Sequence, residues 1–111
     1  VLDQFAQYVD YVSPMLYPSG FNEGSGGYDI PTENSYGLLK QSLELSADRL
    51  QGISTKVRPW LQSFPDYAWD VPYGLPQYLE QRRASEEVGT SGWLYWNAAG
   101  EYDERTFVEN P

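Results

Sequence analysis

Gly92-Trp93-Leu94-Tyr95-Trp96-Asn97 is an apolar, aromatic run of strand length, and it decides the fold that the sequence predicts. A glycine begins it, and the asparagine that ends it leads into a glycine-containing loop. Short apolar runs bounded by turn residues are typical of buried strands. Two earlier stretches, residues 10–19 and 56–64, have the same character. The sequence therefore predicts three strands, over residues 11–17, 57–62 and 92–96.

The first two predicted strands alternate between two kinds of side chain, as a strand with two different faces does. The face expected to pack under helices carries Val12, Pro14, Leu16, Val57, Pro59 and Leu61. The opposite face carries Ser13, Met15, Tyr17, Arg58, Trp60 and Gln62. Because buried polar groups need partners, a face with Arg58 and Gln62 is not ordinary core. This second face is where we expect a site.

Segments long enough for helices separate the strands. Residues 1–9 have the spacing of a helix end, and residues 36–51 follow a capping residue. A third helix is expected from about residue 75 or 76 to residue 88, because Pro76 suits a first helical turn. The expected inner stripe of the middle helix is Leu39, Leu43, Ala47 and Leu50. Strands that alternate with single helices predict a parallel α/β sheet with right-handed crossovers. In such folds the site lies at the carboxyl ends of the strands.

Composition excludes several kinds of chemistry. The chain has no Cys and no His, which excludes thiol nucleophiles, Cys-based zinc sites and His-dependent triads within it. A net charge of −9 with seven Lys and Arg argues against a nucleic-acid partner. The sequence has no run of about 18 apolar residues that would predict membrane insertion. It also has no glycine-rich phosphate loop that would predict a nucleotide cofactor. We expect neither cofactor nor metal, with Ca²⁺ in the acidic loop 23–33 as the alternative.

The three strand motifs resemble a known family. Residues 10–19, 57–62 and 92–97, in this order, are similar to the last three strands of the bacterial "putative glycoside hydrolase" family with a (β/α)8 barrel, first defined as a domain of unknown function. A looser likeness to family 18 chitinases matches Met15, Tyr17 and Trp96. There, a Met-x-Tyr on the sixth strand and a Trp ending the eighth strand line the sugar site.

The resemblance implies a TIM (β/α)8 barrel of about 250 residues or more. Three strands cannot close a barrel, so residues 1–111 are expected to be one partial domain, the C-terminal three βα units of a larger enzyme. The missing N-terminal barrel half, or self-association through open sheet edges, is the expected protein partner. The location is unknown; a secreted or cell-envelope protein is one expectation, with any signal lying outside this chain.

The resemblance also implies a carbohydrate substrate and roles for individual residues. Trp96 would stack under a sugar ring, with Met15 and Tyr17 beside it. Arg58 and Gln62 would bind sugar hydroxyls or hold a catalytic carboxylate. The alternative for Arg58 is a structural ion pair inside the barrel. Asn97 would cap a sugar hydroxyl. The core is the expectation for Trp60 and Trp93.

Glycoside hydrolysis usually needs two carboxyl groups across the scissile bond. None of the predicted strands ends in Asp or Glu, and Asp66 is the nearest candidate acid, its alternative being a turn residue beside Pro65. Related barrels often carry the principal acids after strands four and five. We therefore expect a glycoside hydrolase segment that supplies substrate-cleft residues and is inactive alone. The alternative is a non-catalytic carbohydrate-binding or structural barrel domain, and an unrelated nucleotide-binding α/β domain is a third possibility.

Overall fold

The computed structural model describes residues 2–109 of the chain. Its α-helices are α1 (Leu2–Ala6), α2 (Ser35–Arg49) and α3 (Leu75–Val88). Its strands are β1 (Tyr11–Val12), β2 (Lys56–Val57), β3 (Trp60–Gln62) and β4 (Leu94–Trp96). Four 3₁₀ turns complete the order: η1 (Pro18–Gly20), η2 (Ser25–Gly27), η3 (Pro31–Glu33) and η4 (Glu104–Thr106). The chain is thus a small mixed helix and strand domain.

All strand pairs are parallel, as predicted. β1 pairs with β2, and β3 pairs with β4. The backbone between these pairs continues the ladder, because Arg58 donates to the Val12 carbonyl at 3.0 Å and Trp60 donates to the Pro14 carbonyl at 2.9 Å. A single parallel bridge joins Met15 to Trp60. Three chain segments therefore lie side by side in sequence order, although their regular parts are shorter than expected.

Prolines explain why the regular strands are short. A proline has no N–H to donate to a ladder. Pro14 lies inside the first predicted strand and Pro59 inside the second. The predicted strand over residues 11–17 is regular only in β1. The predicted strand over residues 57–62 is divided into β2 and β3 at Arg58 and Pro59.

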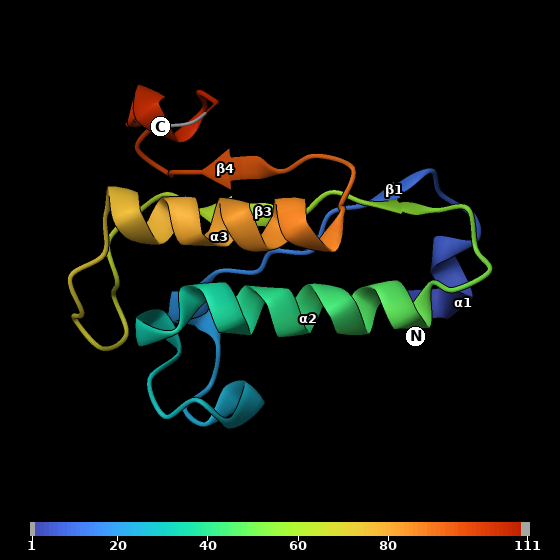
Figure 1. Cartoon of the computed structure of the whole chain (residues 1–111), viewed down its shortest axis with the longest axis horizontal. Helices are drawn as coiled ribbons and strands as arrows, with labels where there is room; N and C mark the ends of the chain where they lie inside the picture. Colours follow the sequence, from blue (N-terminus) through green and yellow to red (C-terminus); the bar gives the residue numbers. More distant parts are fainter. Residues whose placement is uncertain (1, 110–111) are drawn as a thin grey trace.

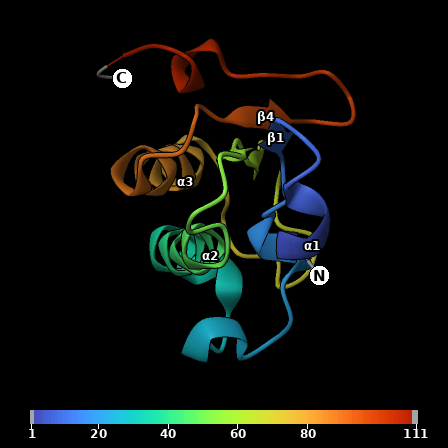
Figure 2. The same ribbon diagram turned by 90° about the vertical axis from the view of Figure 1, so that its right-hand side faces the viewer.

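The helices α2 and α3 lie next to each other on one side of the strands, and they point opposite to the strand direction (Figures 1 and 2). The main core between these layers consists of Leu39, Leu43, Leu61, Ala84 and Tyr95. A second cluster near α1 consists of Ala6, Val12 and Leu50. The predicted helix-facing side of the strands is therefore confirmed. Ala47, in the expected α2 stripe, is exposed, although it lines a pocket with Leu43, Leu50 and Val57.

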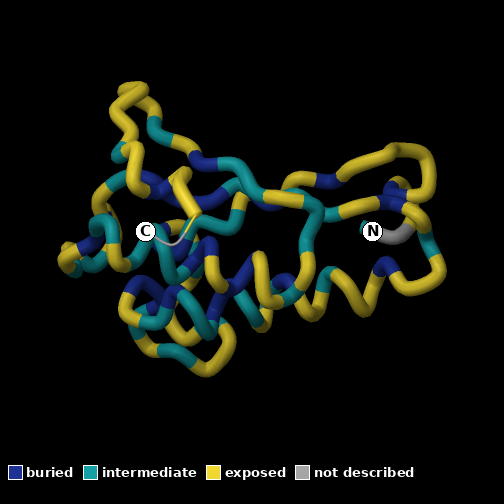
Figure 3. The backbone as a smooth tube through the Cα atoms, turned by 45° about the horizontal axis from the view of Figure 1, so that its top comes forward, coloured by how far each residue is buried: buried dark blue, intermediate teal, exposed yellow. Residues whose placement is uncertain are grey.

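The helix boundaries agree closely with those expected. α3 spans residues 75–88, and Gly89 ends it with a φ of +85°, a left-handed conformation that glycine adopts readily. α2 starts one residue before the predicted position and ends two before it. Buried and exposed residues are interspersed along both helices, and most residues of the outer loops are exposed (Figure 3).

The long loop between the first strand segment and α2, residues 18–34, is organised into the three turns η1, η2 and η3. It packs against α2 at a site that needs a small residue. A Cβ atom at Gly37 would lie 2.2 Å from the Tyr28 hydroxyl, so a larger side chain would displace this ring. Gly37 therefore lets the loop approach the helix at the carboxyl end of the first strand segment.

Candidate functional site

The strand face opposite the helices carries apolar side chains that water can reach. Met15 is 71% exposed and Trp96 is 45% exposed. Trp60, on the middle segment, lies edge-on to Trp96 with ring centroids 6.1 Å apart and an interplanar angle of 86°. We call Met15, Trp60 and Trp96 the open face. It unites two predicted site residues, and it corrects the expectation for Trp60, which is partly exposed rather than core.

Tyr17 extends this surface at the carboxyl end of the first segment. Its ring meets Phe64 edge-on, with centroids 5.4 Å apart. Met15 and Tyr17 share a pocket of about 340 Å³, whose other walls are Gly20, Phe21, Asn22 and Ser25. Burial raises the pKa of the Tyr17 phenol, and the Tyr102 phenol raises it further. Tyr17 is therefore a neutral hydrogen-bonding group at physiological pH.

Gln62 lies at the carboxyl end of β3 but is fully buried. Its Nε2 donates to Ser19 Oγ at 2.8 Å and to the Phe64 carbonyl at 3.1 Å. Its Oε1 accepts from the Ser19 N–H at 3.0 Å. Both amide protons are therefore in use within the protein. This geometry makes Gln62 a residue that joins two loops and leaves it no donor for a sugar hydroxyl.

Asp66 is only 6% exposed, and protein donors surround its carboxylate. Ser19 Oγ donates to Oδ1 at 2.8 Å, and Thr32 Oγ1 donates to Oδ2 at 3.0 Å. Three backbone N–H groups of its own loop also donate to it, those of Ala68, Trp69 and Val71. These contacts match the interpretation of Asp66 as a turn residue. Its role as a catalytic acid stays a prediction that the geometry does not favour.

The protonation of Asp66 follows from these contacts. Burial alone would raise the pKa of a carboxyl group, but the hydrogen bonds from Val71, Ala68, Ser19 and Thr32 outweigh it and lower the pKa of Asp66 below its ordinary value. A general acid needs the opposite shift, toward the operating pH. Asp66 is therefore an ionised acceptor that stabilises its loop.

Arg58 lies nearer the amino ends of the strands. Its Nε donates to the Ser91 carbonyl at 2.7 Å, and its guanidinium carbon lies 4.4 Å from the centre of the Tyr11 ring. The cation therefore fixes the turn before β4 and covers an aromatic face. These contacts give Arg58 a structural role. The expected structural alternative was an ion pair, whereas the partners here are a backbone carbonyl and an aromatic ring.

Asn97 organises the loop after β4. Its Nδ2 donates to the Ser63 carbonyl at 2.7 Å. Its Oδ1 accepts from the N–H groups of Ala99 at 2.9 Å and Glu101 at 3.2 Å. Its own N–H donates to the Tyr102 hydroxyl at 3.0 Å. The side chain thus joins the ends of the second and third segments, and its contact with a sugar hydroxyl stays a prediction.

Sequence reasoning missed three residues that hold this end of the strands together: Ser19, Thr32 and Gln81. Ser19 and Thr32 lie in different turns of one loop, η1 and η3, and meet at Asp66. Gln81, fully buried on α3, pairs with the backbone of Gln62. No local pattern marks these residues, because their partners are 19 to 47 positions away along the chain.

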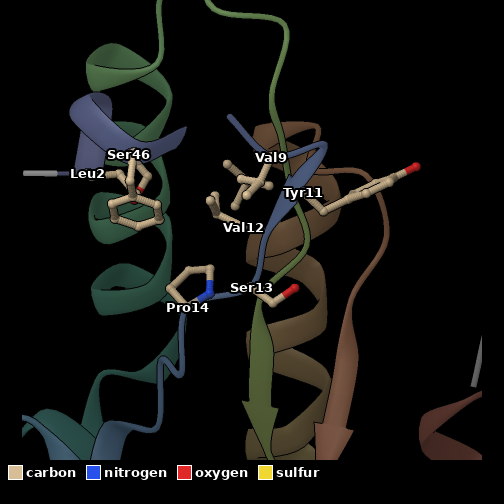
Figure 4. A pocket seen from close by; sticks show the side chains of 9 residues that line it. Leu2, Val9, Tyr11, Val12, Ser13, Pro14 and Ser46 are labelled. Carbon is tan, nitrogen blue, oxygen red and sulfur yellow. The ribbon is translucent and has the colours of Figure 1, made fainter. Parts of the chain in front are cut away.

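A second pocket, of about 390 Å³, lies at the other end of the strands. Its walls are mostly apolar and come from α1, the first strand segment, α2 and β2 (Figure 4). Val9 and Val12 lie near its centre, whereas the Tyr11 ring points away from them. It contains no acidic or basic side chain. It is therefore a packing surface rather than a place for acid–base chemistry.

Among residues 2–109, no three Asp or Glu side chains come close enough together to hold a metal ion. The acidic loop proposed for Ca²⁺ thus forms no such cluster in the described residues. None of the helices there has both the length and the apolar character needed to cross a membrane.

Comparison with known proteins places these features in context. No curated protein matches the chain. Its structure is similar to the crystal structure of bee venom hyaluronidase, with a TM-score of 0.53 and 17% sequence identity. The match covers 87% of this chain and 30% of the hyaluronidase chain, so this chain spans about a third of that protein's length. At this identity, the match shows a likeness of fold.

The sequence itself gives the family. The family described as "Putative glycosyl hydrolase domain" matches residues 1–102, which is nearly the whole chain. The match includes the three strand segments and both long helices. It therefore covers the open face and the loops beside it. The chain belongs to this glycosyl hydrolase family.

Proposed function

We propose that this chain forms one sector of a glycoside hydrolase barrel and supplies part of its substrate cleft. The observation that carries the proposal is the open face, where an exposed methionine and two tryptophans gather on the strand face opposite the helices, with Trp96 at the carboxyl end of β4. Indole rings offer flat apolar surfaces with a polar edge, which suits the apolar face of a sugar ring. Met15, Tyr17 and Trp96 are the proposed contacts with a poly- or oligosaccharide.

The buried polar residues have a different part in this proposal. Gln62, Asp66 and Asn97 hold the loops that surround the open face, through bonds to Ser19, Thr32 and Ser63. They position the aromatic residues rather than contact the reacting bond. Arg58 supports the opposite end of the strands. The acids for hydrolysis would come from other strands of the barrel, so this chain alone would bind sugar without cleaving it.

An open edge of the sheet supports the proposal that this chain is part of a barrel. The carbonyls of Asp10, Val12 and Pro14 accept hydrogen bonds from the second segment. In a parallel ladder, the intervening Tyr11 and Ser13 direct their backbone groups to the other side, where no other described strand lies. The apolar pocket of Figure 4 adjoins the same edge. We propose that further βα units, or a second copy of the chain, pack there.

A non-catalytic carbohydrate-binding domain is the second candidate. The state of Asp66 favours it, because this candidate acid is buried and accepts hydrogen bonds from its own loop. Both candidates need sugar to bind at the open face, and they differ in whether carboxyl groups complete the site. Hydrolysis by the complete barrel would distinguish them.

The test measures binding and cleavage together. The 111-residue chain and its Trp96→Ala variant are incubated with a panel of oligosaccharides, and binding and release of reducing sugar are recorded in parallel. We expect the chain to bind oligosaccharides without turnover. The Trp96→Ala variant should bind about tenfold more weakly, because it loses one stacked ring. Equal binding by a folded Trp96→Ala variant would remove Trp96 from the site. Turnover would show that acids of this chain complete a catalytic site.

A further inference from the structure

A second aromatic surface lies outside the open face, in the loop after β3. Tyr67 is 71% exposed, although it packs against a neighbour. Its ring is stacked on Phe64, with centroids 6.3 Å apart and an interplanar angle of 14°. Phe64 in turn contacts Tyr17, a proposed sugar contact. The three rings thus form a continuous aromatic series that leads away from the first strand segment.

The backbone on both sides of Tyr67 is fixed. Phe64 accepts a hydrogen bond from Gln62 Nε2 at its carbonyl, 3.1 Å away. After Tyr67, the N–H groups of Ala68 and Trp69 donate to the Asp66 carboxylate at 3.0 and 3.2 Å. An exposed ring on an ordered loop loses little conformational entropy when a ligand stacks on it. This arrangement is typical of a binding residue.

Tyr67 also lies at the rim of the pocket that Met15 and Tyr17 line. A Cβ atom at Gly20, one wall of this pocket, would lie 3.6 Å from the Tyr67 hydroxyl. The pocket volume of about 340 Å³ is in the range of small-ligand sites. Asn22 and Ser25 add neutral hydrogen-bonding groups to its wall. Rings and hydroxyl-binding groups therefore meet in one concave place.

The absence of charged side chains in the wall of this pocket indicates which sugars it can bind. None of its six wall residues is Lys or Arg, and none is acidic. The chain as a whole carries a net charge of −9. A carboxylated or sulfated sugar would find no cation there and would be repelled by the protein's field. An uncharged sugar ring has no such cost.

We infer that Tyr67 and this pocket form a second sugar position, separate from Trp96, that accepts an uncharged ring. The inference rests on the proposed carbohydrate function and deepens it, because it names the charge class of the ligand. Tyr67 contacts the ligand directly, with its ring as the stacking surface and its hydroxyl over the pocket rim. The two positions together favour oligosaccharides over single sugars.

The experiment measures affinity by calorimetry for neutral oligosaccharides of two to six glucose or N-acetylglucosamine units, and for uronic-acid oligosaccharides of equal length. The variants are Tyr67→Ala, Tyr67→Phe, Trp96→Ala and Tyr8→Ala. Tyr8 is the matched control, because it is 81% exposed and lies in the turn after α1, outside the pocket. Circular dichroism checks the fold of each variant.

We expect Tyr67→Ala to weaken binding of the longer neutral oligomers about three- to tenfold. Tyr67→Phe, which retains the ring, and Tyr8→Ala should bind like the unmodified chain. Unchanged affinity in Tyr67→Ala, with affinity still lost in Trp96→Ala, would overturn this inference alone. Tighter binding of uronic-acid oligomers than of neutral ones would overturn the charge assignment. Absence of binding to every oligomer would overturn the proposed function as well.

Discussion

The side-chain amide of Gln81 pairs with both backbone groups of Gln62. Its Oε1 accepts from the Gln62 N–H at 2.8 Å, and its Nε2 donates to the Gln62 carbonyl at 2.9 Å. A glutamine of α3 thus takes the place that a neighbouring strand would have. Because both residues are fully buried, this pair fixes the helix layer to the end of β3 without water.

Replacing Gln81 should therefore destabilise the fold. Gln81→Leu has a similar volume but leaves a buried N–H and a buried carbonyl unpaired, which costs about 2 to 4 kcal/mol. Urea unfolding gives the change in the free energy of unfolding. Gln51→Leu is the control, because Gln51 is exposed after α2 and should change stability by less than about 0.5 kcal/mol. Equal effects of the two substitutions would show that the Gln81 pair contributes nothing.

Asp66 should make stability depend on pH in the acid range. Its folded pKa lies below its ordinary value, so between these two pKa values the unfolded chain binds more protons than the folded chain. The stability that Asp66 contributes is therefore fully present above about pH 4 and is lost as the pH falls through the folded pKa.

Asp66→Asn tests this. The substitution should cost about 2 kcal/mol at pH 7, the size of hydrogen bonds to a charged group, and less at pH 3. Urea unfolding at both pH values measures the difference. Asp70→Asn is a control in the same loop, because Asp70 is exposed and its φ of +54° suits asparagine. A cost for Asp66→Asn that is the same at pH 7 and pH 3 would contradict the role of the carboxylate.

Arg82 should hold the C-terminal segment. It is 7% exposed, it donates to the carbonyls of Thr106 and Val108, and it lies over the Trp93 ring. We expect Arg82→Ala to accelerate hydrogen exchange at residues 104–108, measured by mass spectrometry. Arg83→Ala is the matched control, because the neighbouring Arg83 side chain is 60% exposed and makes a long ion pair with Glu87 at 3.9 Å. Equal exchange in the two variants would show that Arg82 does not restrain the segment.

Local patterns were sufficient to predict the elements of the fold. Alternation identified the helix-facing side of the strands, with Val12 and Leu61 buried as expected. Pro76 and Gly89 placed the start of α3 to within one residue and its end at Val88. Pro14 and Pro59 shortened the regular strands, because a missing N–H interrupts pairing even where the chain stays extended. The pattern indicated where the chain is extended, and hydrogen bonding decided where it is a regular strand.

The candidate site was less predictable, because its polar residues act through distant partners. Gln62 and Asp66 have the residue types of ligand contacts, yet Ser19 and Thr32 bind them inside the protein. Nothing near them in the sequence reveals those partners. Met15 was placed by strand alternation, which is local, and Trp96 by the resemblance; both lie on the open face.

The most direct test follows the indole signals of the four tryptophans by NMR while a neutral oligosaccharide is added to the chain. The indole N–H signals of Trp96 and its neighbour Trp60 should shift with the sugar concentration, because they lie on the open face. The signal of Trp93, which packs against the helix-facing core, should stay in place. Shifts confined to Trp93, or no shift of Trp96 at sugar concentrations that saturate binding, would contradict sugar binding at the open face.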